Sequence, residues 1–153
     1  MDVTIPNGIK SIGYAAFYGC SSLKNLIIPD SVTKIESWAF AHCCDLVAIH
    51  IPDSVTYIGY SVFSDCYGLM SVKLPNDIVN IENLTFNNCY NLKSVTVPQS
   101  VKNIGFAAFS RCLNLEKINY DGTETQWAAI YKDPTWDSGC GKHTIDYTPA
   151  QRD

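Results

Sequence analysis

The sequence of 153 residues predicts a repeat solenoid, a fold in which the chain winds through stacked coils of nearly equal length. The first observation is a proline that recurs every 23 residues, at Pro6, Pro29, Pro52, Pro75 and Pro98. The second is that four other columns keep the same step: isoleucine from Ile12 to Ile104, phenylalanine from Phe17 to Phe109, cysteine from Cys20 to Cys112 and leucine from Leu23 to Leu115. A period of about 20–29 residues on an apolar skeleton is typical of a solenoid whose coils are single repeats. We therefore expect residues 1–118 to form an array of about five 23-residue coils.

The front of each repeat predicts a β-strand. In the second copy, Leu23-x-x-Leu26-x-Ile28 has the i, i+3, i+5 spacing of a leucine-rich repeat strand. Because side chains alternate along a strand, Leu26 and Ile28 face inward while Asn25 and Ile27 face outward. Pro29 has no N–H and ends the strand. Stacked copies then form a parallel sheet along one face, with neighbouring strands about 4.8 Å apart.

The back of each repeat predicts a short extended segment followed by turns. Residues 31–35 are rich in β-branched side chains. Residues 38–43 turn the chain back and are too few for an α-helix, so we expect short turns or a single 3₁₀ turn. The column after Ile35 alternates between two residue types: Gly13, Glu36, Gly59, Glu82 and Gly105. Glutamate disfavours a left-handed backbone, so this column is not expected to require positive φ.

The cysteine column has two interpretations. Neighbouring coils bring cysteine Cα atoms within the range of a disulfide, but their Cβ vectors should run parallel and stay far apart. No C-x-x-C motif is present and no histidine recurs beside the cysteines, which disfavours a metal framework. We interpret the column as small, buried, reduced thiols that act as weak S–H donors.

The period fails after Ile118, so residues 119–153 are expected to form a C-terminal α/β capping unit. Thr123-Glu124-Thr125-Gln126 is a capping box and predicts a helix over about residues 124–131. Pro134 ends the helical pattern, and a closing strand is predicted over about residues 143–148. No polar cap precedes the first coil, so we expect weak self-association through residues 1–23.

The repeat unit resembles the BspA-like subfamily of leucine-rich repeats, which is clearest at residues 92–115, LKSVTVPQSVKNIGFAAFSRCLNL. The resemblance covers residues 3–118. It implies a leucine-rich-repeat right-handed superhelix with a parallel β-sheet on one face and short turns or 3₁₀ pieces on the other. It also implies an extracellular or cell-surface protein, because family members are mostly surface or secreted proteins of bacteria and some parasitic protists, implicated in adhesion and host-protein binding. The family has no catalytic motif and no fixed set of binding residues.

Composition and motifs disfavour several classes of function. A net charge of −4 argues against nucleic acid as the main partner, because phosphate binding needs a basic face. No run of apolar residues is long enough to span a membrane. Met1-Asp2 leads directly into a repeat, so we expect no signal peptide and a piece of a longer array.

No catalytic, cofactor or metal site is predicted. Residues 42–45, His-Cys-Cys-Asp, have the residue types of a thiol protease, but a triad needs partners from separate segments. Asp30 and Asp53 share a column, but two carboxylates are fewer ligands than Ca²⁺ requires. An enzyme would need a deep pocket between the array and the C-terminal unit.

Two surfaces are candidates for binding a protein ligand. The first is the outer face of the sheet, whose candidate residues are Asn25, Ile27, Ala48, His50, Ser71, Lys73, Ser94 and Thr96. The second is a set of aromatic residues expected on the opposite side: Trp38, Tyr57, Tyr60, Tyr67 and Tyr90. These aromatic residues fit either an interface or a cover for the repeat edges. The sequence thus favours a non-enzymatic protein-binding or adhesion module, with a structural spacer inside a longer repeat protein as the alternative.

Overall fold

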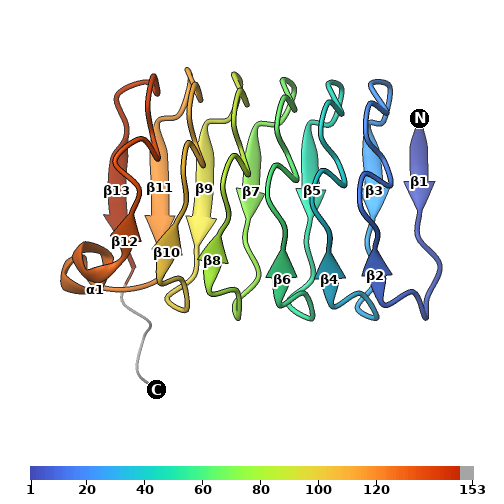
Figure 1. Ribbon diagram of the computed structural model, residues 1–153, viewed down its shortest axis with the longest axis horizontal. Helices are drawn as coiled ribbons and strands as arrows, with labels where there is room; N and C mark the ends of the chain where they lie inside the picture. Colours follow the sequence, from blue (N-terminus) through green and yellow to red (C-terminus); the bar gives the residue numbers. More distant parts are fainter. Residues whose placement is uncertain (149–153) are drawn as a thin grey trace.

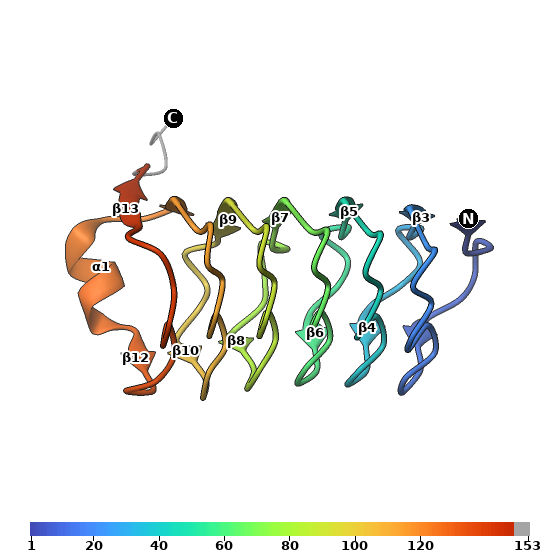
Figure 2. The same cartoon turned by 90° about the horizontal axis from the view of Figure 1, so that it is seen from above.

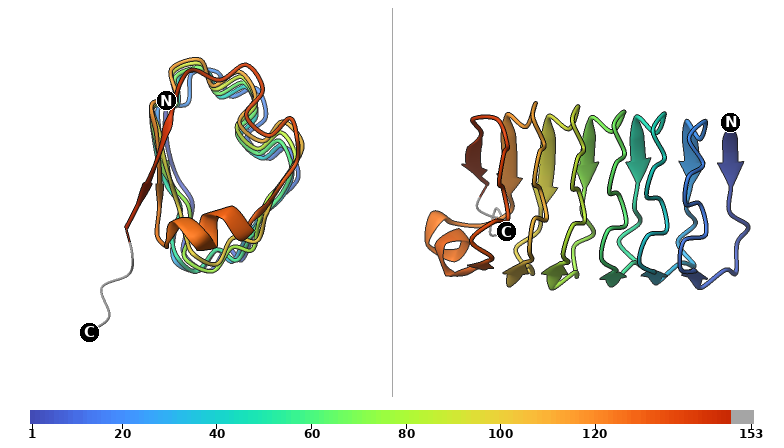
Figure 3. Two further views of the ribbon diagram at one scale, coloured as in Figure 1. Left: turned by 90° about the vertical axis from the view of Figure 1, so that its left-hand side faces the viewer. Right: turned by 45° about the horizontal axis from the view of Figure 1, so that its top comes forward.

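The structure, a computed structural model, describes residues 1–148 and is a β-solenoid of about six turns. The coils lie side by side along the long axis (Figure 1) and superpose when viewed along it (Figure 3). The predicted repeat solenoid with a parallel sheet is therefore confirmed. It has about six turns rather than five coils, because the chain after Ile118 completes a further turn with a different sequence.

A seven-stranded parallel sheet covers one side of the solenoid (Figure 2). Its strands, in spatial order, are β1 (Asp2–Thr4), β3 (Asn25–Ile27), β5 (Ala48–His50), β7 (Ser71–Lys73), β9 (Ser94–Val97), β11 (Lys117–Tyr120) and β13 (Thr144–Tyr147). Leu26 and Ile28 are buried while Asn25 and Ile27 are exposed, as their alternation predicts. The ladder joins equivalent residues of successive coils, so the repeat period itself sets the register.

The opposite side carries short strands in two separate three-stranded sheets. One contains β2 (Ser11–Ile12), β4 (Lys34–Ile35) and β6 (Tyr57–Ile58); the other contains β8 (Asn80–Ile81), β10 (Asn103–Ile104) and β12 (Tyr131–Lys132). Within residues 1–148, the interruption falls only between β6 and β8.

A serine hydroxyl reinforces this side at three of the four other junctions, all except that between β10 and β12. Ser31, Ser54 and Ser100 each donate a hydrogen bond to a carbonyl of the preceding coil, at 2.8, 2.7 and 2.6 Å respectively. In the fourth coil Asp77 occupies the same column. An ionised carboxylate has no proton to donate, so the carbonyl of Val55 receives no equivalent bond. The interrupted ladder thus coincides with the loss of this donor.

The return segment is a series of tight turns, and residues 1–148 contain no 3₁₀ helix. Two columns have positive φ: one comprises Ala15, Trp38, Ser61, Leu84 and Ala107, and the other comprises Gly19, His42, Asp65, Asn88 and Arg111. Left-handed residues four positions apart interrupt any helical turn. Backbone N–H groups in these turns therefore bond in part to the next coil and in part within their own coil. Phe40 N–H donates to Val62 O of the next coil at 3.0 Å, whereas Cys43 N–H donates to Phe40 O of its own coil at 3.2 Å.

The alternating glycine column has no positive φ, as the sequence predicted. Its physical reason is close backbone approach. A Cβ atom on Gly59 would lie 2.5 Å from the backbone nitrogen of Ser37, and one on Gly105 would lie 2.8 Å from the backbone nitrogen of Asn83. Odd-numbered coils therefore approach the coil before them more closely than a side chain permits.

A stack of phenylalanine rings runs through the core. The centroids of Phe17, Phe40, Phe63, Phe86 and Phe109 are separated by 5.4, 5.7, 5.5 and 5.2 Å in turn, with interplanar angles of 18° or less. The cysteines lie beside this stack. Cys43, Cys66, Cys89 and Cys112 each donate an S–H bond to the phenylalanine carbonyl of the preceding coil at 3.1–3.2 Å.

The C-terminal segment continues these columns with different residues. Trp136 meets Phe109 edge-on at 5.8 Å, and Cys140 Sγ donates to Phe109 O at 2.8 Å. Helix α1 (Glu124–Ala129) lies across this end of the solenoid (Figure 3). Both bonds of the predicted capping box are present, between Thr123 and Gln126. The helix stops before the predicted residue 131, because Tyr131 and Lys132 pair with β10 as strand β12.

We predict that removing one ring from the phenylalanine stack strongly destabilises the protein. Phe63 is fully buried between two rings, so Phe63→Ala should lower the free energy of unfolding by about 3–5 kcal/mol. Tyr67 is 36% exposed and stacks only on Tyr90, so Tyr67→Ala should cost about 0.5–1.5 kcal/mol. Urea unfolding measures both. Equal midpoints for the two variants would contradict the assignment of Phe63 to the core.

The serine column predicts that the interrupted ladder can be repaired. Asp77→Ser should restore a donor to Val55 O and raise the free energy of unfolding by about 0.5–1.5 kcal/mol. Asp77→Ala is the matched control, because it removes the carboxylate without supplying a hydroxyl. A stabilisation as large in the alanine variant would show that the hydrogen bond is not its cause.

Candidate protein-binding surfaces

The eight candidate residues on the sheet lie on four adjacent strands, β3, β5, β7 and β9. The register places Ile27, His50, Lys73 and Thr96 in one row across the strands, and Ala48, Ser71 and Ser94 in a second. Ile27 is 63% exposed, whereas Ser94 and Thr96 are half-buried. The predicted residues therefore form one continuous patch, which we call the sheet face.

All polar side chains of the sheet face except Asn25 are available to a partner. Asn25 donates to Asp2 Oδ1 at 2.9 Å. His50, Lys73 and the three hydroxyl-bearing residues of the face make no side-chain hydrogen bond or ion pair within residues 1–148. At the C-terminal end of the same sheet, Lys117 and Asp146 form an ion pair at 2.6 Å. The face thus combines one large exposed aliphatic side chain, Ile27, and the small Ala48 with small polar groups and two basic side chains.

The five aromatic residues singled out from the sequence do not form a single group. Tyr57 lies beneath the Lys34 ammonium at 5.0 Å. Tyr67 stacks on Tyr90 with centroids 5.0 Å apart. Trp38 meets Tyr60 edge-on at 6.4 Å.

Three further exposed aromatic residues on the return turns were missed: Tyr14, Tyr18 and Phe106. Tyr18 lies 6.0 Å from Trp38, centroid to centroid. The sequence pattern could have identified Tyr14 and Phe106, because an aromatic residue follows the glycine in every second repeat, at Tyr14, Tyr60 and Phe106.

Four of the five thiols in the cysteine column are buried and unreactive, whereas Cys20 in the first coil is partly exposed. All seven cysteines of the chain are free, and the four central members of the column are buried. Burial raises the pKa of Cys43 to about 12 and that of Cys66 well above its usual value. Since only the thiolate is a nucleophile, these groups are inert at neutral pH.

The His-Cys-Cys-Asp segment is not assembled into a catalytic group. The ring of His42 faces the next coil, where its Nε2 lies 3.7 Å from Asp65 Oδ2. Cys44 Sγ donates to the carbonyls of His42 and Asp65, at 3.4 and 3.9 Å. Asp65 Oδ1 also accepts from Asn88 at 2.8 Å. These side chains brace neighbouring turns.

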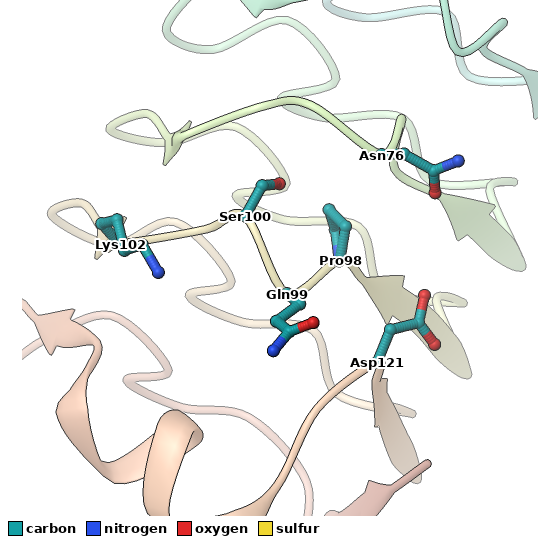
Figure 4. A pocket seen from close by; sticks show the side chains of 6 residues that line it. All are labelled: Asn76, Pro98, Gln99, Ser100, Lys102 and Asp121. Atoms are coloured by element: carbon teal, nitrogen blue, oxygen red, sulfur yellow. The ribbon is translucent and has the colours of Figure 1, made fainter. Parts of the chain in front are cut away.

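A polar hollow of about 490 Å³ lies at the strand ends of the fourth to sixth coils (Figure 4). Asn76, Pro98, Gln99, Ser100, Lys102 and Asp121 line it. Ser100 Oγ is bonded to Ile78 O, and the Asn76 amide to Asp53 Oδ2. The hollow therefore brings together no nucleophile and base.

Neither a metal cluster nor a membrane span is found in the described part of the chain. Residues 1–148 contain no group of three or more His, Cys, Asp or Glu side chains that could hold a metal ion. No helix within these residues is long and apolar enough to cross a bilayer. Asp53, considered above as a calcium ligand, instead accepts two hydrogen bonds from Asn76 of the next coil.

An apolar hollow of about 300 Å³ lies beside β1 and is lined mainly by Val3, Ile5, Ile9, Ile12 and Phe17. Strand β1 pairs with β3 on one side only. Self-association through residues 1–23 stays a prediction.

The relationship to known proteins follows from the repeats. A sequence model described as the BspA type leucine-rich repeat region matches residues 1–125 in six copies. The chain belongs to the BspA-type leucine-rich repeat family. The resemblance inferred from the sequence is thereby confirmed, and the BspA-type family is generally non-catalytic. No functionally curated protein matches the sequence significantly.

Solved structures of other leucine-rich repeat proteins share the fold. The leucine-rich repeat protein TpLRR of T. pallidum is 30% identical, with a TM-score of 0.66, over 78% of this chain and 72% of its own. A leucine-rich repeat protein of Bacteroides ovatus is 25% identical, with a TM-score of 0.62, over 94% of this chain and 42% of its own. A leucine-rich cell surface protein of Faecalibacterium prausnitzii is 24% identical, with a TM-score of 0.51, over 86% of this chain and 62% of its own. This BspA-type chain thus spans less than two thirds of the last two.

The thiol environments predict a pattern of alkylation. In native protein at pH 8, iodoacetamide should label only the three partly exposed cysteines, Cys20, Cys44 and Cys140. With its pKa of about 12, Cys43 should be ionised in about one molecule in ten thousand and should react only after denaturation.

Peptide mapping by mass spectrometry after native and denatured labelling measures this pattern. Loss of hydrogens in pairs from the intact mass would contradict it, because that result would indicate disulfides.

Proposed function

We propose that this chain is a non-enzymatic protein-binding or adhesion module that acts through the faces of its solenoid. The observation that supports the proposal most directly is the sheet face. Ile27 on β3 is exposed beside His50 on β5, and the same row continues to Lys73 on β7. An exposed apolar centre with unpaired polar neighbours is the composition that a protein partner can bury.

The thiol and pocket chemistry agrees with a binding role. The buried cysteines are neutral, and the polar hollow offers hydrogen-bonding groups that already serve the protein. A broad, repetitive surface then provides the means of recognition, as in other solenoids.

We further propose that the chain belongs to a protein displayed on the cell surface or secreted. Membership of the BspA-type family supports this location. The leucine-rich cell surface protein of F. prausnitzii shares the fold. The partner in this setting would be an extracellular or host protein.

The alternative is a structural spacer within a longer repeat protein. The uninterrupted columns of the core and the parallel ladder along the whole sheet favour a rigid rod. A spacer would need no particular side chains on the sheet face and would show no saturable binding to proteins.

A charge introduced at the sheet face tests the proposal. Immobilised wild-type protein should bind intact host cells or purified extracellular proteins saturably, and Ile27→Glu should weaken that binding by about tenfold or more. Val79→Glu is the matched control, because Val79 is a similarly exposed aliphatic residue, 50% exposed, beside β8 on the other side of the solenoid.

Equal loss of binding in both variants would indicate unfolding or a general effect of charge. Unchanged binding in the Ile27 variant would exclude the sheet face. No saturable binding by wild-type protein to any of these targets would favour the spacer.

A further inference from the structure

An exposed aromatic strip runs along the return turns, away from the sheet face. It consists of the exposed Tyr14, Tyr60 and Phe106 and the half-buried Trp38, with the exposed Tyr18 beside Trp38. Tyr14, Tyr60 and Phe106 are 67, 46 and 50% exposed. Between Tyr14, Tyr18 and Trp38 the surface is hollowed by about 300 Å³.

The fold does not require aromatic residues at these positions. Ser37 and Asn83 occupy the same column as Tyr14, Tyr60 and Phe106 in the even-numbered coils. Trp38 has a φ of 63° and Leu84 a φ of 61°, in a left-handed region that bulky side chains rarely adopt. The other coils carry Ala15, Ser61 and Ala107 in this column with the same left-handed backbone, so the fold requires the conformation but not a bulky side chain.

The strip has a period of two coils. Tyr14, Tyr60 and Phe106 are separated by 46 residues, twice the 23-residue repeat. Strands of neighbouring coils are about 4.8 Å apart and the stacked phenylalanine rings are 5.2–5.7 Å apart, so two coils advance about 10–11 Å. A polyproline II helix has three residues per turn and rises about 3.1 Å per residue, or about 9.3 Å per turn. A proline-rich segment lying along the strip would therefore place about one side chain per turn of its own helix against the aromatic residue of each odd-numbered coil.

The polar groups of the strip match the same ligand. A polyproline II helix has no internal hydrogen bonds, so its carbonyls need external donors. The hydroxyls of Tyr14 and Tyr60 and the indole N–H of Trp38 can donate, and none of them bonds to protein within residues 1–148. Asn83 Oδ1 accepts from the Phe106 N–H at 2.8 Å and thereby fixes the coil that carries Phe106.

The charge beside the strip favours a basic residue in the ligand. Glu82 precedes Asn83 in the coil between Tyr60 and Phe106, and it makes no ion pair within the described residues. Its counterpart in the second coil, Glu36, is already paired with Lys34 at 2.7 Å. The uncompensated carboxylate therefore complements an arginine or lysine flanking the prolines.

We propose that the aromatic strip binds a proline-rich peptide in the polyproline II conformation, with a basic residue of the peptide near Glu82. Aromatic-lined grooves are a recurrent means of recognising such helices, because rings pack against proline and the ligand is already ordered. The four coil steps from Tyr14 to Phe106 span about 19–22 Å, the length of about six to seven residues in this conformation. This surface is separate from the sheet face, so the two proposals stand or fall independently.

Isothermal titration with a synthetic peptide tests the proposal. The probe is a peptide of about ten residues, all proline except for an arginine at each end; the comparison is a glycine–serine peptide of the same length and charge. Only the proline peptide should bind saturably. Tyr60→Ser and Phe106→Ser should each weaken it by about tenfold. Both variants should keep the fold, because Ser37 occupies the equivalent position.

Two further variants distinguish the contribution of the Glu82 charge to peptide binding from that of the aromatic rings. Glu82→Gln should weaken binding at low ionic strength and reduce its dependence on salt. Ile27→Ser, on the sheet face, should leave it unchanged. Equal binding of the glycine–serine peptide, or no effect of Tyr60→Ser, would overturn the proposal. So would a strip that instead binds an oligosaccharide or a second copy of the chain, detected by titration and by sedimentation.

Discussion

Each coil depends on the coil before it for the burial of one aromatic ring and the pairing of one thiol. Phe63 fills the core only because Phe40 and Phe86 cover its two faces, at 5.7 and 5.5 Å. Cys66 finds an acceptor only in the carbonyl of Phe40. A change of one residue in repeat length would displace both contacts at once, so the period of 23 residues is a packing constraint as much as a sequence pattern.

The same constraint explains the backbone of the return turns. To place each phenylalanine above the last, the chain passes through two left-handed residues in every regular coil, even where the residue is tryptophan, leucine or arginine. The energetic cost of these conformations is offset by backbone bonds to the next coil, such as Trp38 N–H to Tyr60 O at 3.1 Å. A helix in this segment could not make those bonds, because its N–H groups would be used internally.

Fixing the core in this way leaves the outward columns free to vary. Side chains on the sheet face are mostly small and polar, whereas those on the turns alternate between aromatic and polar residues in successive coils. Each surface is a set of straight rows, since equivalent residues of successive coils lie side by side. A solenoid of this kind recognises partners through rows of side chains rather than through an enclosed site. Inert, neutral thiols inside and unpaired polar groups outside agree with that division of roles.

The sequence by itself determined the coil, the parallel sheet, the inward columns and the capping box of α1, because each depends on a local pattern repeated at a fixed spacing. It also placed the eight residues of the sheet face on one surface, since the alternation of a strand assigns them outward. Only the tertiary structure revealed the features that depend on how closely neighbouring coils approach each other.

The glycines at 59 and 105 are explained by backbone nitrogens of the preceding coil, which a Cβ would meet at 2.5 Å at Gly59 and at 2.8 Å at Gly105. The early end of α1 arises because Tyr131 and Lys132 pair with β10, a contact between segments far apart in sequence. The break between β6 and β8 coincides with a missing hydroxyl donor at Asp77, which becomes visible once the other serines are seen to reach the preceding coil. Local patterns specify each coil, but only the stacked coils show which atoms meet.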